Sequence, residues 1–273
     1  MSLVDAVRAI PIKSADEIEG MRRAGALAHD TLVYALSLAQ PGTVTSEIDT
    51  KVERFMRDHN ARPATLGYKG YPKSTCISVN EVICHGIPGA WRLRSGDIVC
   101  IDVTVILEGF YGDTAATVPV GEVKADAANL MRVTLEACRL GIGAIRPDGR
   151  LGDVGAAIQD HVESQGCSVV RNFVGHGIGR RFHEPPQVRH YGKKGTGPRL
   201  RPGMTFTVEP MVNAGAWQSE ILDDGWTAVT VDGSLSAQYE HTIEVTTEGA
   251  RILTKPATAT GDWYPPGGVE LPV

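Results

Sequence analysis

The chain has 273 residues, of which 42% are hydrophobic and 22% charged, and its formal net charge is −5 at pH 7. This composition is typical of a globular protein, and it lacks the cationic excess that binding nucleic acid as a main task requires, so no DNA partner is expected. Asp5, Arg8 and Lys13 interrupt the N-terminal apolar residues, and no run of 18 apolar residues exists. The sequence therefore predicts neither a secretory signal nor a membrane contact, and a cytoplasmic protein is expected.

The cysteines are odd in number and show no C-x-x-C spacing; they are Cys76, Cys84, Cys100, Cys138 and Cys167. Disulfide frameworks use paired cysteines, and thiolate zinc sites use closely spaced ones, so both are disfavoured. We expect reduced thiols that are mostly buried.

The first predicted elements are two helices. Ser14, with Glu17 three residues later, is typical of a capping box at a helix start. Apolar or small residues then recur at helical spacing until Gln40-Pro41-Gly42 ends the run; they are Ile18, Met21, Gly25, Ala28 and Leu32. A second helix is expected from about Thr45 to Asn60, with an apolar face formed by Ile48, Val52, Phe55 and Met56.

Strands are predicted next. Residues 76–80 alternate between apolar and polar, and two longer strand-forming runs, 98–107 and 110–118, flank a short Glu108-Gly109 turn. Such a turn between two alternating runs predicts a β-hairpin.

After residue 121 the order of elements repeats. Helices are predicted over 126–140 and 153–165, and strands over 204–212, 228–231 and 236–246. Two halves, each with helices before strands, indicate a pseudo-symmetric α+β domain whose helices cover one face of a mostly antiparallel sheet. We expect an N-terminal segment (1–10), one catalytic domain (11–250, halves 11–121 and 122–250) and a Pro/Gly-rich tail (251–273) that is either irregular chain laid on the surface or disordered.

Two aspartates are expected to meet in the first hairpin. With the turn at Glu108-Gly109, counting back places Asp102 opposite Ala115, so Asp102 and Asp113 become diagonal neighbours on one face. Two carboxylates at that separation can share a cation, whereas without one they repel. The alternative is that one aspartate caps a turn and the other is solvated. A shift of one residue in the register of the hairpin would place the two aspartates on opposite faces of the sheet.

The second half adds candidate ligands. His176 lies in Gly175-His176-Gly177-Ile178-Gly179, and His183 follows in Phe182-His183-Glu184. Glu209 and Glu240 interrupt runs of strand-forming residues, where a buried carboxylate must be paired, protonated or metal-bound. His85 precedes a turn. A lone histidine is more often a hydrogen-bonded structural residue, and His85 taken alone is equally compatible with being a turn histidine.

Together these residues stand in motifs that resemble, in order, those of the methionine aminopeptidases. The motifs are Ser78-Val79-Asn80 with His85-Gly86, Ile101-Asp102-Val103, Gly112-Asp113-Thr114, Gly175-His176-Gly177-Ile178-Gly179, Phe182-His183-Glu184, Val208-Glu209-Pro210 and Gln238-Tyr239-Glu240-His241-Thr242. The resemblance covers about residues 11–247 and implies the pseudo-twofold pita-bread fold. The lack of an N-terminal zinc-binding extension and the short path from His183 to Glu209 are similar to the simple bacterial type I enzymes.

The resemblance implies removal of the initiator methionine from nascent chains with a small second residue, by attack of a metal-bridging hydroxide. It implies a site for two divalent ions formed by Asp102, Asp113, His176, Glu209 and Glu240. Glu209 would also move a proton, and His85 and His183 would bind the substrate or the developing oxyanion. Oxygen-rich ligation favours manganese, iron or cobalt, with zinc and nickel as alternatives.

The resemblance also implies a methionine pocket, a third cation site and partners. The pocket would be formed by Tyr68, Tyr71, Cys76, His85, Phe182, His183 and Trp226, and Thr65 replaces a cysteine common in bacterial relatives. Asn80, Val82 and Ser236 match positions that hold a monovalent cation such as sodium or potassium.

A monomer is the expected oligomeric state. Seven cationic residues between Arg180 and Arg201 would form either a ribosome-docking patch or an ordinary solvated loop. Two rival functions share the resemblance: an Xaa-Pro aminopeptidase or dipeptidase of the same fold, and a non-catalytic pita-bread binding protein.

Overall fold

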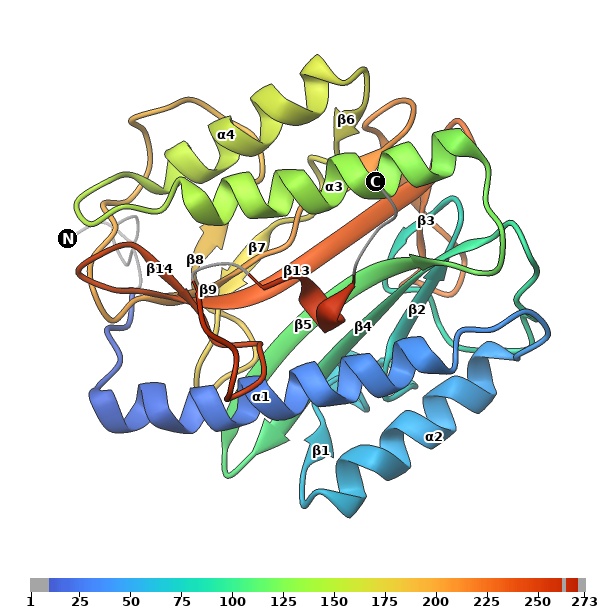
Figure 1. Cartoon of the computed structure of the whole chain (residues 1–273), viewed down its shortest axis with the longest axis horizontal. Helices are drawn as coiled ribbons and strands as arrows, with labels where there is room; N and C mark the ends of the chain where they lie inside the picture. Colours follow the sequence, from blue (N-terminus) through green and yellow to red (C-terminus); the bar gives the residue numbers. More distant parts are fainter. Residues whose placement is uncertain (1–9, 262–263, 270–273) are drawn as a thin grey trace.

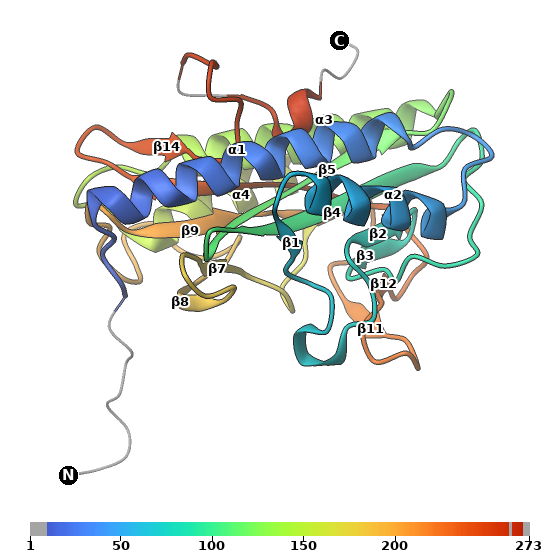
Figure 2. The same cartoon turned by 90° about the horizontal axis from the view of Figure 1, so that it is seen from below.

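Four helices lie on one side of an antiparallel sheet in the computed structural model, which describes residues 10–261 and 264–269. They are α1 (Ala15–Ser37), α2 (Thr45–Asp58), α3 (Ala125–Gly143) and α4 (Leu151–Ser164). Figure 1 shows α1 and α3 crossing the same face of the sheet, and Figure 2 shows that this face is opposite to the loops around β8 and β11. None of the helices in the described ranges combines the length and apolar character needed to cross a bilayer.

The main sheet has eleven strands, and their order along its path is β1-β4-β5-β13-β9-β7-β8. The strands on this path are β1 (Arg62–Pro63), β4 (Ile98–Leu107), β5 (Phe110–Pro119), β7 (Gly175–Gly177), β8 (Glu184–Val188), β9 (Thr205–Val208) and β13 (Ser236–Val245). Four short strands join at its sides: β2 (Cys76–Val79), β6 (Ser168–Val169), β10 (Met211–Asn213) and β14 (Ala250–Ile252). A separate small sheet contains β3 (Val82–Cys84), β11 (Ser219–Ile221) and β12 (Ala228–Thr230). The α+β class, the helix layer and the antiparallel pairing are thus confirmed.

The capping box predicted at the start of α1 is present. Ser14 Oγ accepts the Glu17 N–H at 3.2 Å, and Glu17 Oε2 accepts the Ser14 N–H at 3.0 Å. These two bonds satisfy amide donors that have no partner within the helix.

The first hairpin has the predicted register. Leu107 pairs with Phe110 and Asp102 pairs with Ala115. The turn residues Glu108 and Gly109 have φ values of +52° and +79°, the left-handed geometry that matches the twist of two-residue hairpins.

The strand predicted over 204–212 is wrong in one respect, because it is two strands. β9 ends at Val208 and β10 begins at Met211, with Glu209 and Pro210 between them. Pro210 has no N–H to donate to a ladder, so pairing with β13 is interrupted at this point. The interruption frees Glu209 from the regular ladder.

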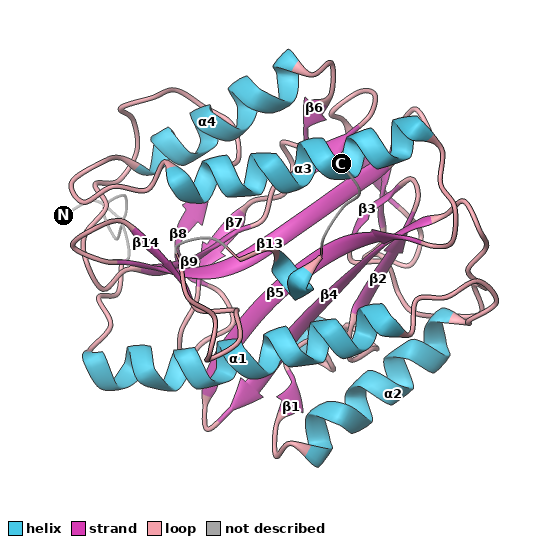
Figure 3. Ribbon diagram, viewed as in Figure 1, coloured by secondary structure: helices cyan, strands magenta, loops and turns pink. Residues whose placement is uncertain are grey.

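The two halves meet where β5 pairs with β13. Ala115 lies opposite Glu240 and Ala116 opposite Tyr239. Figure 3 shows these long strands side by side at the centre of the sheet, with α1 over one half and α3 over the other. The central pairing therefore places one acid from each half of the chain on neighbouring strands.

The chain after β13 packs against the domain more closely than the expected irregular tail. β14 pairs with β13 across the boundary expected at residue 250, and a short 3₁₀ turn, η2 (Pro266–Gly268), contacts α1 and β5. The buried His241 lies 2.6 Å from the Tyr264 carbonyl oxygen through its Nε2. The described part of the tail thus covers buried polar groups, while residues 1–9, 262–263 and 270–273 fall outside the described chain.

Candidate metal centre

A cavity of about 280 Å³ contains all five predicted ligands in its lining. Asp102 comes from β4, Asp113 from β5, His176 from β7 and Glu240 from β13, and Glu209 follows β9. Candidate ligands from four strands and from the residue that follows a fifth therefore converge, because the order of the sheet places these five strands side by side.

The donor atoms are close enough to share ions. Asp113, His176 and Glu240 each offer one atom within 4.8 Å of the others. His176 Nε2 lies 3.4 Å from Asp113 Oδ2 and 3.8 Å from Glu209 Oε1. Three carboxylates and one imidazole thus place donor atoms within a few ångströms of one another.

Burial and mutual repulsion make the charged forms of these carboxylates unfavourable unless a cation is bound. Burial, reinforced by the nearby Asp113 and Glu209 charges, raises the pKa of Asp102 and that of Glu240 well above their usual range. Burial also raises the pKa of Glu209 to about 7, against the opposing influence of His176. Asp102 Oδ1 and Glu240 Oε1 are buried and have no hydrogen-bond partner among the described residues.

These observations fit divalent metal ions. Buried carboxylate oxygens without donors are unfavourable unless a cation is present, and oxygen with one imidazole is a donor set that suits manganese, iron or cobalt. His176 Nδ1 lies 3.0 Å from the Gly177 carbonyl oxygen, so a proton on Nδ1 leaves Nε2 free to ligate.

Hydroxyl groups hold two of the carboxylates in place. Thr104 Oγ1 donates to Asp113 Oδ1 and Thr207 Oγ1 donates to Glu209 Oε1, both at 2.7 Å. We did not predict these threonines. Two signals would have identified them, because Thr104 is opposite Asp113 in the predicted hairpin and Thr207 is two residues before Glu209 on the expected strand.

A third unpredicted residue, His190, supports Glu209 from its backbone. The Glu209 N–H donates to His190 Nε2 at 3.0 Å, and burial lowers the pKa of His190 to about 3. His190 is therefore neutral near pH 7 and can accept this bond. Its sequence context, among surface loop residues, carries no signal of this role.

The two predicted accessory histidines also line the cavity. The His183 ring lies 4.0 Å from the His176 ring, centroid to centroid, and burial together with His176 lowers the pKa of His183 to about 4. Burial lowers the pKa of His85 as well, and its backbone has a φ of +56°. Both imidazoles are therefore neutral at pH 7, each with one N–H to donate.

All seven residues of the predicted methionine pocket line this cavity. Aromatic side chains dominate the wall: Tyr68 and Phe182 rings lie 4.9 Å apart, and Tyr71 meets Trp226 edge to face at 5.2 Å. The sequence interpretation missed further lining residues, namely Lys69, Asn172, Phe173, Val174 and Met211.

Thr65 is buried in the same lining, and its hydroxyl has no hydrogen-bond partner within the described chain. The predicted monovalent-cation residues lie apart from the cavity. Asn80, at the turn after β2, accepts the Ser236 N–H through its carbonyl oxygen at 2.9 Å. Val82 begins β3 and pairs with Val229.

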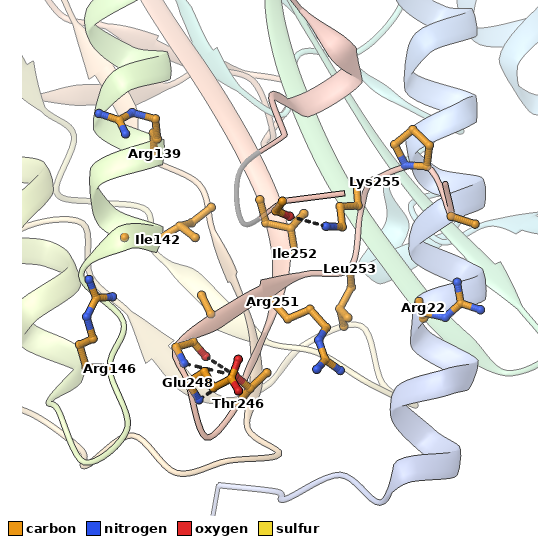
Figure 4. Close-up of a pocket in the computed structure, with 16 residues that line it drawn as sticks. Arg22, Arg139, Ile142, Arg146, Thr246, Glu248, Arg251, Ile252, Leu253 and Lys255 are labelled. Atoms are coloured by element: carbon orange, nitrogen blue, oxygen red, sulfur yellow. Dashed lines mark hydrogen bonds between the residues drawn. The ribbon is translucent and has the colours of Figure 1, made fainter. Parts of the chain in front are cut away.

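A larger cavity, of about 710 Å³, lies between α1, α3 and β14 (Figure 4). Its charged lining is mostly cationic, and three of its arginines already pair with acids: Arg22 with Glu19, Arg139 with Glu136 and Arg251 with Glu244. The chemistry is therefore assigned to the smaller cavity, where the carboxylates and imidazoles converge.

Comparisons with known proteins agree with this assignment. The model of metallopeptidase family M24 matches residues 19–247. Methionine aminopeptidase A of Synechocystis is 55% identical over 246 residues, which are 90% of this chain and 97% of that protein.

Solved structures give the same result. The crystal structure of methionine aminopeptidase from Rickettsia prowazekii has a TM-score of 0.89 and 49% identity, over 90% of this chain and 99% of that one. The prolidase from Pyrococcus furiosus, at 23% identity and a TM-score of 0.70, shares the fold over 89% of this chain and 65% of its own. The chain belongs to metallopeptidase family M24 and, within it, to the methionine aminopeptidases.

Proposed function

We propose that this enzyme is a type I methionine aminopeptidase that removes the initiator methionine from polypeptides with a small second residue. One observation supports this most directly: four carboxylates and one imidazole, side chains of the kinds that bind divalent ions, converge in a cavity whose walls are aromatic and sulfur-containing. Such walls suit a thioether side chain.

Asp102, Asp113, His176, Glu209 and Glu240 would hold two divalent ions. When bound, such ions polarise a carbonyl group and make a water molecule more acidic. Their four negative charges approximately balance two dications, which removes the repulsion that raises the pKa of Asp102 and Glu240.

Glu209 is the residue best placed to move a proton. Thr207 holds one of its oxygens, and the Gln238 amide is 3.4 Å from the other. In this role Glu209 accepts a proton from the attacking water and delivers it to the leaving amine.

His85 and His183 would donate hydrogen bonds to the scissile carbonyl oxygen as negative charge develops on it. Their neutral state is suitable, because a neutral imidazole retains one N–H donor. Such donors typically contribute about 10² to 10³ in rate.

The test uses protein stripped of metal by a chelator and then given manganese, iron or cobalt. Release of free methionine is measured from Met-Ala-Ser, Met-Leu-Ser and Xaa-Pro peptides. We expect metal-dependent cleavage of Met-Ala-Ser and little of Met-Leu-Ser. Cleavage only before proline would instead assign the protein to the prolidase-like peptidases, and inactivity with every metal would indicate a binding protein.

The same proposal includes a cytoplasmic monomer with a monovalent cation at Asn80, Val82 and Ser236. The conformation of this turn supports the cation site. Asn80 has a φ of +56°, its side-chain NH2 group donates a hydrogen bond to Asp97, and its side-chain oxygen accepts one from the Ile98 N–H. Potassium-dependent thermal stability would test it.

Transient ribosome contact is proposed through the 180–201 loop. Arg180 and Arg199 are already paired with Glu17 and Asp148, whereas Lys193 and Lys194 are exposed. Reversal of both lysines to glutamate should weaken salt-sensitive co-sedimentation with ribosomes. The control is reversal of Lys51 and Lys124, and equal binding by both variants would remove the idea.

A further inference from the structure

The hairpin formed by β11 and β12 stands beside the cavity and carries only acidic charges. Residues 213–235 contain no lysine or arginine, and their acids are Glu220, Asp223, Asp224 and Asp232. Figure 2 shows this hairpin projecting from the face of the molecule opposite to α1 and α3, next to the loop that follows β1.

Asp224 fixes the tip of this hairpin to the cavity wall. Its carboxylate accepts the N–H groups of Trp226 and Thr227, both at 2.8 Å, and the Thr227 hydroxyl at 2.6 Å. Trp226 lines the cavity and meets Tyr71 edge to face. The Gly225 N–H closes a β-turn on the Leu222 carbonyl oxygen at 2.9 Å.

Of the other three acidic residues in the hairpin segment, one has a structural role, and the side chains of the other two have no partner within the described chain. Asp232 accepts the N–H groups of Ala216 and Ser234. The side chains of Glu220 and Asp223 are exposed, and within the described chain they form no hydrogen bond or ion pair. Two negative charges are therefore available at the tip.

Apolar side chains are exposed in the same place. Ile221 is 57% exposed and Leu222 is 43% exposed. Leu66, in the loop that also contains Tyr71, is 43% exposed. The hairpin that contributes Trp226 to the cavity wall thus carries exposed apolar side chains together with two exposed acidic ones, and the lining itself includes a cation, Lys69.

A bound polypeptide would leave the cavity past residues of its lining, and Trp226 of the hairpin is one of them. If the first residue occupies the cavity, the rest of the chain leaves through its mouth, with about 3.3 Å per extended residue. Asp223 is three residues from Trp226, so their Cα atoms are at most about 10 Å apart. This distance is similar to the Debye length of about 10 Å at 0.1 M salt.

We propose that the β11–β12 hairpin is an extended substrate-binding surface that favours lysine or arginine at about the third to sixth positions after the N-terminal methionine. The partner is the downstream part of the substrate polypeptide, recognised through charge complementarity with Glu220 and Asp223. This inference rests on the proposed function, because it requires the cavity to hold the first residue.

The test compares two amidated peptides with the same head, Met-Ala-Ser-Gly-Lys-Lys and Met-Ala-Ser-Gly-Glu-Glu. The measured quantity is the ratio of their kcat/KM values, in which effects on the shared methionine cancel. We expect the manganese-loaded enzyme to prefer the basic peptide by roughly three- to tenfold at low salt, the range that a few exposed charge pairs provide. The preference should approach unity in 0.5 M KCl.

The variant Glu220→Gln/Asp223→Asn should lose this preference and still cleave Met-Ala-Ser within about twofold of the unmodified rate. A matched control, Asp30→Asn/Asp160→Asn, makes the same change in net charge on the exposed surfaces of α1 and α4. The control should keep the preference.

Three outcomes would overturn the inference. A kcat/KM ratio near unity at low salt would contradict the inference, and so would a ratio that the hairpin variant leaves unchanged. In either case, cleavage of Met-Ala-Ser would leave the proposed function intact. Failure of the unmodified enzyme to cleave Met-Ala-Ser with any metal removes both.

Discussion

At the scale of single residues, the main feature is a group of buried acids that the fold does not neutralise. Asp102 Oδ1 and Glu240 Oε1 have no donor among the described residues, and burial raises the pKa of both groups. Carboxylates in such positions lower the stability of the metal-free protein and provide strong ligands once a cation binds. Function and stability are therefore opposed at these residues.

Asp102→Asn should accordingly stabilise the metal-free protein, by about 1–3 kcal/mol at pH 7.5. Because the pKa of Asp102 is raised in the folded state, the folded chain binds more protons than the unfolded one above pH 4, and its stability falls as pH rises. The advantage of the variant should grow from pH 4 to pH 8. Thermal unfolding in chelator measures it, and equal melting temperatures at every pH would contradict the argument.

Glu209→Gln should lower kcat for Met-Ala-Ser by about 10² to 10⁴, because glutamine keeps the size and the Thr207 contact but accepts no proton. The melting temperature should change little. Glu244→Gln is the matched control, since Glu244 is on β13 and pairs with Arg251 outside the cavity. Activity of the Glu209 variant within tenfold of the unmodified enzyme would exclude a proton-transfer role.

At the scale of elements, α1 sets the position of β5 through a backbone contact. A Cβ atom at Gly112 would lie 2.5 Å from the Ala24 carbonyl oxygen and 2.7 Å from the Gly25 nitrogen. Gly112 precedes Asp113. A change in the distance between α1 and β5 at Gly112 would therefore also displace the Asp113 carboxylate. Glycine is required because only its lack of a side chain allows this approach.

Gly112→Ala should therefore destabilise the protein by about 1–3 kcal/mol, since α1 must move away from β5. It should also reduce metal affinity by displacing Asp113. Gly143→Ala, at the end of α3, is the control, because a Cβ there meets nothing within 4 Å. Thermal unfolding and manganese titration distinguish the two, and similar behaviour of both variants would show that the close contact has no energetic role.

At the scale of the whole molecule, the proposed metal centre would join the two halves of the chain. Asp102 and Asp113 come from the first half, and His176, Glu209 and Glu240 come from the second, across the β5–β13 pairing. A cation bound by both halves stabilises only the folded arrangement. Binding is therefore coupled to global stability.

Manganese added to the chelator-treated protein should raise its melting temperature by roughly 5–10 °C at a concentration about 100 times the dissociation constant. That occupancy corresponds to about 2.7 kcal/mol for one site. Calorimetry over a manganese series measures the shift, and Glu240→Gln should reduce it. A melting temperature independent of manganese, iron and cobalt would contradict a metal centre at this position.

The sequence by itself determined the local elements and one crucial register. The capping box at Ser14, the Glu108-Gly109 turn and the alternation of its flanking strands are set by neighbouring residues, so the pairing of Asp102 with Ala115 could be counted from the sequence. The ligand set came from motifs resembling a known family. The class of the fold followed from the order of the elements.

Only the tertiary structure decided which distant groups complete the site. His190 accepts the Glu209 amide from a position 19 residues earlier in the chain, and Phe173 meets the His85 ring at 5.5 Å from a different half. The tail covers His241 in the same way. Contacts of this kind depend on how the sheet brings separate loops together, and no periodicity or spacing along the chain records that arrangement.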